Sequence, residues 1–165
     1  MNKLLLIALI VGISFSVDAK KKEDNWRQNI QLEGVSISRS NAVVKVSIVD
    51  KKKDKVTEDI VGKCAVYGIL FKGYVIKSTT NAGYGDSSQP ALVGGLAAEQ
   101  QHIDFFNPFF ENGDYAKYVQ LINDSRRVTK VGKEYKVSTT VSVNIEQLRK
   151  DLEQAGILRK LNSGW

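Results

Sequence analysis

Apolar and polar residues alternate in three segments of the chain, which predicts strands with one buried and one solvent-facing side. The alternation covers residues 35–38, 44–48 and 134–143. Residues 39–41, between the first two segments, indicate either a hairpin turn or an irregularity within one long strand. Gly132-Lys133 separates the third segment from residues 126–131, and this pattern predicts a second hairpin.

Helical spacing predicts two helices with well-marked ends. The first is capped by Thr57, continues to about Lys72 and stops at Gly73. Its second half is apolar on all sides, which predicts a buried, central helix. The second helix begins after Asn144 and ends at Gly156. Its apolar stripe consists of Ile145, Leu148, Leu152 and Ala155.

Gly62, Gly68 and Cys64 indicate how the first predicted helix packs in the domain. Gly62 and Gly68 each weaken a helix by about 1 kcal/mol relative to alanine, so we expect close packing against a sheet to explain them. Cys64 is the only cysteine, so an internal disulfide is excluded. The apolar residues around Cys64 predict a buried, unreactive thiol.

The middle of the chain carries weaker signals. Residues 74–77 predict a short strand, and residues 96–106 predict a helix that Asn107-Pro108 ends. The turn-forming residues of 78–95 predict one long loop, which makes this segment the first place to look for a binding site. A further helix is expected over 114–122, with an inner side formed by Tyr115, Tyr118, Val119 and Ile122.

Together these elements predict the fold class α+β. We expect a single domain over residues 20–165, built on a largely antiparallel sheet that helices cover on one face. A chain of this length buries enough apolar surface to fold as one unit.

Residues 1–19 predict a secretory signal peptide. Lys3 precedes the apolar run 4–17, and Val17-Asp18-Ala19 supplies small residues for cleavage. The run is shorter than the roughly 20 residues of a membrane-spanning helix, so we expect no membrane span after cleavage. No cysteine near the end of the run offers a thiol for lipid attachment. The expected location is the periplasm or the cell exterior.

The chain is basic, with a formal net charge of +6. Much of the excess lies in two lysine-rich runs, residues 20–22 and 51–55, which we expect at two separate tips with no continuous stripe between them. No aromatic residue lies closer to either run than Trp26, so a nucleic acid is not an expected partner. The runs indicate either solvated charge that aids solubility or adhesion to anionic surfaces such as lipid headgroups or polysaccharide.

No combination of residue types indicates catalysis. His102 is the only histidine, and neither Cys64 nor any carboxylate lies at a spacing that would complete a metal site or activate a nucleophile. We therefore predict no catalytic residue, no metal and no cofactor.

Four phenylalanines lie within six positions, at Phe105, Phe106, Phe109 and Phe110. We expect them to wedge a bent helical corner onto the sheet. An exposed aromatic platform for a sugar or peptide is the alternative. The candidate ligand-binding residues come from this corner and the 78–95 loop, and are Tyr84, Asp86, His102, Phe109 and Phe110.

Residues 130–157 join a strand to a helix written Leu148-Arg149-x-x-Leu152-x-x-x-Gly156. This segment resembles the strand-then-helix ending of small envelope domains such as the N-terminal domain of flagellar assembly protein T and related lipoproteins. Segments 65–73 and 105–110 are similar to those of uncharacterised secreted proteins of Gram-negative bacteria. The resemblance implies an exported envelope protein and carries no activity. The chain departs from these proteins in lacking a lipid-acceptor cysteine and in its long loop at 78–95.

These observations predict an exported, non-catalytic binding or adaptor domain of the cell envelope. Its expected partner is an envelope protein or a cell-surface polysaccharide, bound by the 78–95 loop and the aromatic corner. The alternative is a small secreted hydrolase or carbohydrate-binding protein with a pocket under that loop. A deep pocket in which Asp86 or Asp104 meets His102 would favour the alternative, and a shallow surface above buried aromatic residues would favour the adaptor.

Export of the full-length chain is expected to remove residues 1–19, because the cleavage site is followed by Lys20-Lys21-Lys22, which enters a membrane poorly. Intact-mass spectrometry of the exported protein should show a mature chain that begins at Lys20. Exported protein that keeps the complete precursor mass would show instead that this segment is an uncleaved anchor.

Overall fold

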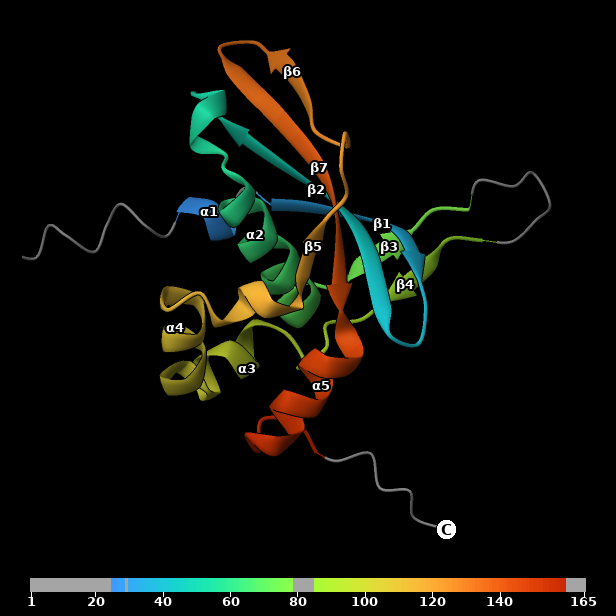
Figure 1. The fold of residues 1–165 in the computed structure, drawn as a ribbon, viewed down its shortest axis with the longest axis vertical. Coiled ribbons are helices and arrows are strands. Elements are labelled where there is room, and N and C mark those ends of the chain that lie inside the picture. The colour runs from blue at the N-terminus through green and yellow to red at the C-terminus, as the bar shows by residue number, and fades with distance from the viewer. Residues whose placement is uncertain (1–24, 29, 79–84, 160–165) are drawn as a thin grey trace, which may run out of the picture.

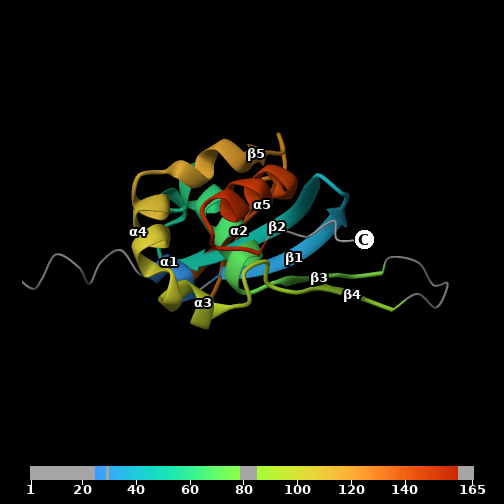
Figure 2. The same ribbon diagram turned by 90° about the horizontal axis from the view of Figure 1, so that it is seen from below.

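The computed structural model describes residues 25–28, 30–78 and 85–159, and these form one α+β domain. Helices lie over one face of a largely antiparallel sheet (Figures 1 and 2), which confirms the predicted fold class. The expected signal peptide and the lysine run 20–22 lie outside the described residues.

Seven strands form the sheet within the described residues. Their order is β4-β3-β1-β2-β7-β5, and β6 pairs with β7 along the same edge as β5. The β1–β3 pair is parallel and the other described pairs are antiparallel. The strands are β1 (Ile30–Ile37), β2 (Asn41–Asp50), β3 (Tyr74–Ile76), β4 (Ser87–Gln89), β5 (Val119–Leu121), β6 (Arg127–Val131) and β7 (Glu134–Asn144).

The helical layer consists of α-helices and two 3₁₀ turns, η1 and η2. Their bounds are α1 (Asn25–Gln28), η1 (Lys53–Lys55), α2 (Glu58–Phe71), α3 (Leu96–Gln101), α4 (Ile103–Glu111), η2 (Asp114–Tyr118) and α5 (Ile145–Gln154). Helix α2 contacts β1, β2, β5 and β7, so it is the element through which the layer packs on the sheet.

Helix α2 is the buried central helix that the sequence predicts. The Thr57 hydroxyl accepts a hydrogen bond from the Ile60 backbone N–H at 3.3 Å, and Gly73 follows the helix with φ +73°. Cys64 is buried, and this burial raises the pKa of its thiol to about 12. The thiol is therefore protonated and unreactive at neutral pH.

The two glycines of α2 allow close packing, as expected. A Cβ atom at Gly68 would run into the side chain of Leu32 on β1, and a Cβ atom at Gly62 would lie 3.0 Å from Val119 Cγ1 on β5. A larger side chain at Gly68 would force the Leu32 side chain to move from its present position.

The predicted hairpin of β6 and β7 is present, and β1 and β2 form a hairpin where the sequence left two alternatives open. The Ser38 N–H donates to the Asn41 carbonyl at 2.8 Å, so residues 39–41 make a turn and do not belong to one long strand. Gly132 has φ +63° in the turn between β6 and β7, a conformation that glycine adopts without strain.

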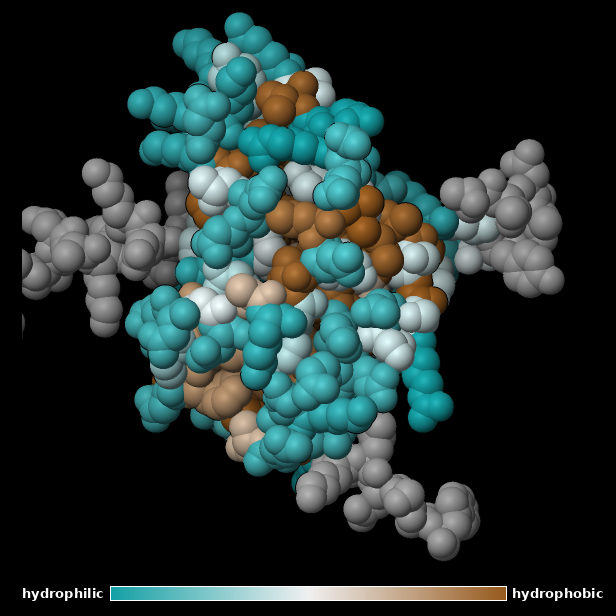
Figure 3. All heavy atoms as spheres, in the orientation of Figure 1, coloured by the Kyte–Doolittle hydropathy of each residue, from teal (hydrophilic) through white to brown (hydrophobic). Residues whose placement is uncertain are grey.

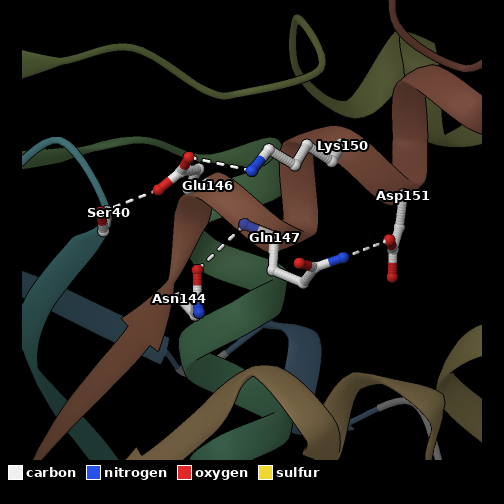
Figure 4. Close-up of polar contacts among 6 residues, drawn as sticks. All are labelled: Ser40, Asn144, Glu146, Gln147, Lys150 and Asp151. Carbon is white, nitrogen blue, oxygen red and sulfur yellow. Dashed lines mark hydrogen bonds and ion pairs between the residues drawn. The ribbon is translucent and has the colours of Figure 1, made fainter.

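Helix α5 begins as predicted (Figure 4). The Asn144 side-chain Oδ1 accepts from the Gln147 backbone N–H at 2.9 Å, and the Gln147 side chain donates to Asp151 at 2.7 Å. Glu146 accepts from the Ser40 hydroxyl at 2.8 Å, which ties the helix start to the β1–β2 turn. The predicted apolar stripe is wrong in one position, because Ala155 is exposed beyond the last turn that meets the core.

The helix predicted over 96–106 differs from the structure. The break lies at His102, between α3 and α4, and Pro108 lies inside α4. An interior proline costs about 3 kcal/mol, but burying a phenylalanine ring contributes about 1.5–3 kcal/mol. Phe106, Phe109 and Phe110 are all buried from this helix, so their combined burial outweighs the proline. The expected burial is confirmed for these three rings, but Phe106 and Phe110 pack on Phe71 and Tyr67 of α2 and not directly on the sheet.

The helix predicted over 114–122 is wrong. Residues 114–118 form η2, and residues 119–121 form β5, which pairs with Val141–Val143 of β7. Tyr115 and Tyr118 are buried, as the three-residue repeat of a 3₁₀ turn allows, whereas Ile122 is exposed. The free backbone edge of β7 needs hydrogen-bond partners, and a strand supplies them where a helix does not.

The segment predicted as one long loop contains a strand. Residues 87–89 form β4, which pairs with β3. Farther along, the N–H groups of Leu92 and Val93 donate to the carbonyls of Ile69 and Leu70, at 3.0 and 3.1 Å. These bonds satisfy carbonyls in the last turn of α2, so this part of the segment is bound to the core.

Helix α1 anchors the start of the domain, in a segment for which the sequence predicted no helix. The Trp26 ring meets the Tyr67 ring edge-on at a centroid distance of 5.1 Å, and Lys63 Nζ lies 4.9 Å from the Trp26 centroid. Buried Glu99 of α3 accepts from the Tyr67 hydroxyl at 2.8 Å and lies 3.6 Å from Arg27 Nε. One aromatic and ionic cluster thus joins α1, α2 and α3.

Replacing Phe106 with alanine should lower the free energy of unfolding by about 3–5 kcal/mol, because the ring is buried and its loss leaves a cavity. Phe105→Ala is the matched control, since this ring is only partly buried and should cost clearly less. Urea unfolding of both variants tests the difference. Equal midpoints for Phe106→Ala and the parent protein would contradict the packing described here.

Asp151 makes stability depend on acid pH. The hydrogen bond from the Tyr118 hydroxyl, at 2.6 Å, and then that from Lys117 Nζ, at 2.9 Å, lower the pKa of Asp151 from 3.8 to about 2. Because the folded-state pKa lies below the unfolded one, this contribution is complete above about pH 4 and is lost as the pH falls toward about 2.

Asp151→Asn should lower stability at neutral pH by roughly 1 kcal/mol, because the charge-assisted bonds are lost. The variant should also lose less stability than the parent protein between pH 4 and pH 2. Urea midpoints measured across this range test both statements. Parallel pH profiles for the two proteins would show that Asp151 is not the responsible group.

Candidate functional site

The structure buries two of the residues that the sequence grouped as a binding site. Phe109 and Phe110 lie in the core, where Phe110 packs against Trp26 at 5.8 Å and Tyr115 at 5.9 Å between ring centroids. Their rings are covered by other side chains of the domain. The aromatic corner is therefore a packing feature of α4.

The other candidates are not brought together. Asp86 is exposed just before β4 and accepts from the Ser78 N–H at 3.1 Å, whereas His102 lies between α3 and α4. Figures 1 and 2 place the outer end of β4 and the α3–α4 junction on opposite sides of the domain. Tyr84 lies outside the described residues. Among the described residues, no three His, Cys, Asp or Glu side chains are grouped so that they could hold a metal ion.

The open face of the sheet is the best candidate site. The described helices pack on one face, and neighbouring residues of a strand point to opposite faces. Val44 and Val46 of β2 are buried under the helices, so Lys45 between them points to the open face. Glu33 of β1 pairs with both Lys45 and Val75 of β3, which places all three on that face.

A hollow of about 220 Å³ lies on the open face. It is lined by Gln31, Leu32, Glu33, Lys45, Ser47, Val75, Lys77 and Lys136. Sites for drug-sized ligands occupy about 300–1,000 Å³, so this hollow is small for an enclosed small-molecule pocket.

The hollow carries a net positive charge. Three lysines, Lys45, Lys77 and Lys136, line it together with a single acid, Glu33. Lys136 Nζ donates to Gln31 Oε1 at 3.3 Å across β2, which holds this cation over the sheet. Such an arrangement suits a carboxylate or another acidic group on a partner.

Aliphatic side chains are exposed near the hollow. Val35 is 53% exposed, Val75 40% and Ile122 41%. Val35 lies in a bulge opposite Val43, and Ile122 continues β5 with its N–H bonded to the Thr140 carbonyl at 3.0 Å. Figure 3 shows hydrophobic residues gathered on the side of the domain where Figure 1 draws β1 and β5, which are separated in the sheet by β2 and β7. Exposed apolar surface of this kind is typical of an interaction site.

The sequence assigned Val35 and Ile37 to a buried face, and the structure corrects this. Both residues are exposed, and β1 is buried at Ile30 and Gly34. Val35 lies in the bulge between Gly34 and Ser36, and Ile37, beyond the bulge, pairs with buried Ala42 but is left uncovered at the end of the strand. The apolar–polar alternation of Ile30 to Glu33 was the signal for the buried part of the strand.

The described residues contain no helix with the length and apolar character needed to cross a membrane. Comparison of the chain with protein-family models, with curated proteins and with solved structures gives no match. The candidate site therefore rests on the geometry of this chain alone.

Proposed function

We propose that this chain is an exported, non-catalytic binding domain of the cell envelope, and that the open face of its sheet binds another envelope protein. The observation that carries the proposal is the combination of exposed Val35, Val75 and Ile122 with the charged hollow beside them. Protein interfaces combine an apolar centre with a polar rim, and this face offers both.

A protein partner suits this face better than a polysaccharide. The exposed large hydrophobic residues of the described part are all aliphatic, so they supply no flat ring on which a sugar could stack. The aromatic residues expected to serve as a platform, Phe109 and Phe110, lie in the core.

A small hydrolase has less support. Asp86 and His102 lie on different elements that are far apart, and the hollow on the open face contains neither residue. A pair of groups that exchange a proton with a substrate must lie within hydrogen-bond reach of the same atoms.

Site-specific photo-crosslinking in cells tests the proposal. A photoreactive residue in place of Val35 or Ile122 should give a discrete adduct with a second protein, because both positions lie in the proposed interface. Leu96 is the control, since it is as exposed but belongs to α3 in the helical layer. Equal adducts from Leu96, or none from Val35 and Ile122, would refute the use of this face.

Val35→Asp should weaken binding to the crosslinked partner by about tenfold or more, as expected for a central apolar contact. The melting temperature should stay that of the parent protein, because Val35 is exposed and contributes little to folding. Unchanged affinity in a folded variant would place the interface elsewhere.

A further inference from the structure

Two basic segments that are far apart in the sequence meet at one end of the sheet. Asp50 at the end of β2 pairs with Tyr135 of β7. Arg126 donates to the Val56 carbonyl at 3.0 Å and to the Lys53 carbonyl at 3.3 Å. The lysine run 51–55 therefore lies beside the β6–β7 hairpin, at the top of Figure 1. We call residues 50–55 and 126–136 together the basic end.

The basic end has a net charge as large as that of the whole chain. It contains nine Lys and Arg and three Asp and Glu, a net charge of +6 that equals the formal net charge of all 165 residues. The sequence singled out only the run 51–55 in this region, and strand pairing adds five cations from the second segment. The sequence did not show that the two segments are neighbours, because about 75 residues separate them. The register of β2 with β7 brings them together.

Most of these cations are free to meet a partner. Lys51, Lys52, Lys53, Lys55, Lys130 and Lys133 are exposed. None of the six forms an ion pair with another described residue. The guanidinium groups of Arg126 and Arg127 bond to backbone carbonyls, which keeps their charge on this end of the domain.

Exposed valines lie among the cations. Val131, next to the turn of the hairpin, is 52% exposed, and Val128 is 45% exposed. Figure 3 shows a small hydrophobic cluster over β6 within a hydrophilic surface. We propose that the basic end binds the surface of an anionic phospholipid membrane, with the lysines over the headgroups and Val131 entering the interfacial layer.

This composition favours a membrane over a soluble polyanion. A nucleic acid or an acidic polysaccharide uses the cations but gains nothing from exposed aliphatic side chains, whereas the interfacial layer of a bilayer accepts them. Tyr135, half-buried, is the one aromatic residue of the two segments, so no platform for stacked bases is present there. Lys136 belongs both to the basic end and to the hollow on the open face, but the six exposed lysines and Val131 do not line that hollow, so the membrane site does not depend on the protein partner proposed for the open face.

Cosedimentation with vesicles tests the proposal on the exported form of the chain. We expect binding to vesicles of phosphatidylcholine with phosphatidylglycerol, little binding to pure phosphatidylcholine, and weaker binding as salt increases. The variant Lys53→Gln with Lys130→Gln should bind about tenfold or more weakly, since each cation near an anionic surface strengthens binding about fivefold.

The matched control is Lys45→Gln with Lys77→Gln, which removes the same charge from the hollow on the open face and should keep near-parental binding. Val131→Thr should weaken vesicle binding several-fold and leave binding to dextran sulfate unchanged, because only the bilayer accepts the valine. Equal losses in the two double variants, or no effect of Val131→Thr, would refute a membrane site. So would a failure to bind the phosphatidylglycerol vesicles.

Discussion

The pairing of β2 with β7 over ten residues is the interaction on which the rest of the domain depends. Its register places Val44 opposite Val141 and Val46 opposite Thr139, and all four side chains are buried on the face that α2 covers. Because the second half of α2 is apolar on all sides, it also needs cover on its outer side. The phenylalanines of α4 and the tyrosines of η2 supply that cover, and the Glu99 cluster then attaches α1 and α3. The sheet thus supports α2, α2 supports α4 and η2, and α1 and α3 attach to these helices.

Elements with local signals could be predicted from the sequence. Each of these signals depends on residues that are close in the sequence, and each is present in the structure. They are the Thr57 and Asn144 caps, the glycines at positive φ and the apolar–polar alternation of β7. The region 96–122 could not be predicted, because distant contacts decide it. Core burial of Phe106, Phe109 and Phe110 carries α4 through Pro108, and the free edge of β7 draws residues 119–121 into a strand.

The location of the candidate site could not be predicted from the sequence. The sequence showed that apolar and basic residues were present but not which of them would lie side by side. The open face is defined by which side of each strand the helices cover, and the bulge after Gly34 separates the alternation of residues 30–34 from that of 35–38, so the sequence pattern alone put Val35 on the wrong face. The basic end likewise arises from pairing between segments that are distant in the chain. Charge runs and apolar alternation therefore identify the residues, while strand register decides which of them become neighbours.

The β2–β7 pairing also determines when the domain can fold. Ser47 and Ser138, whose hydroxyls lie 2.8 Å apart, are 91 positions apart in the chain. The centre of the sheet therefore forms only after nearly all of the polypeptide is available, and closing such a long loop slows this step. Until then the valines of β2 and the apolar surface of α2 lack the contacts that β7 supplies. During synthesis from the N-terminus, the complete sheet can therefore assemble only when β7 has emerged.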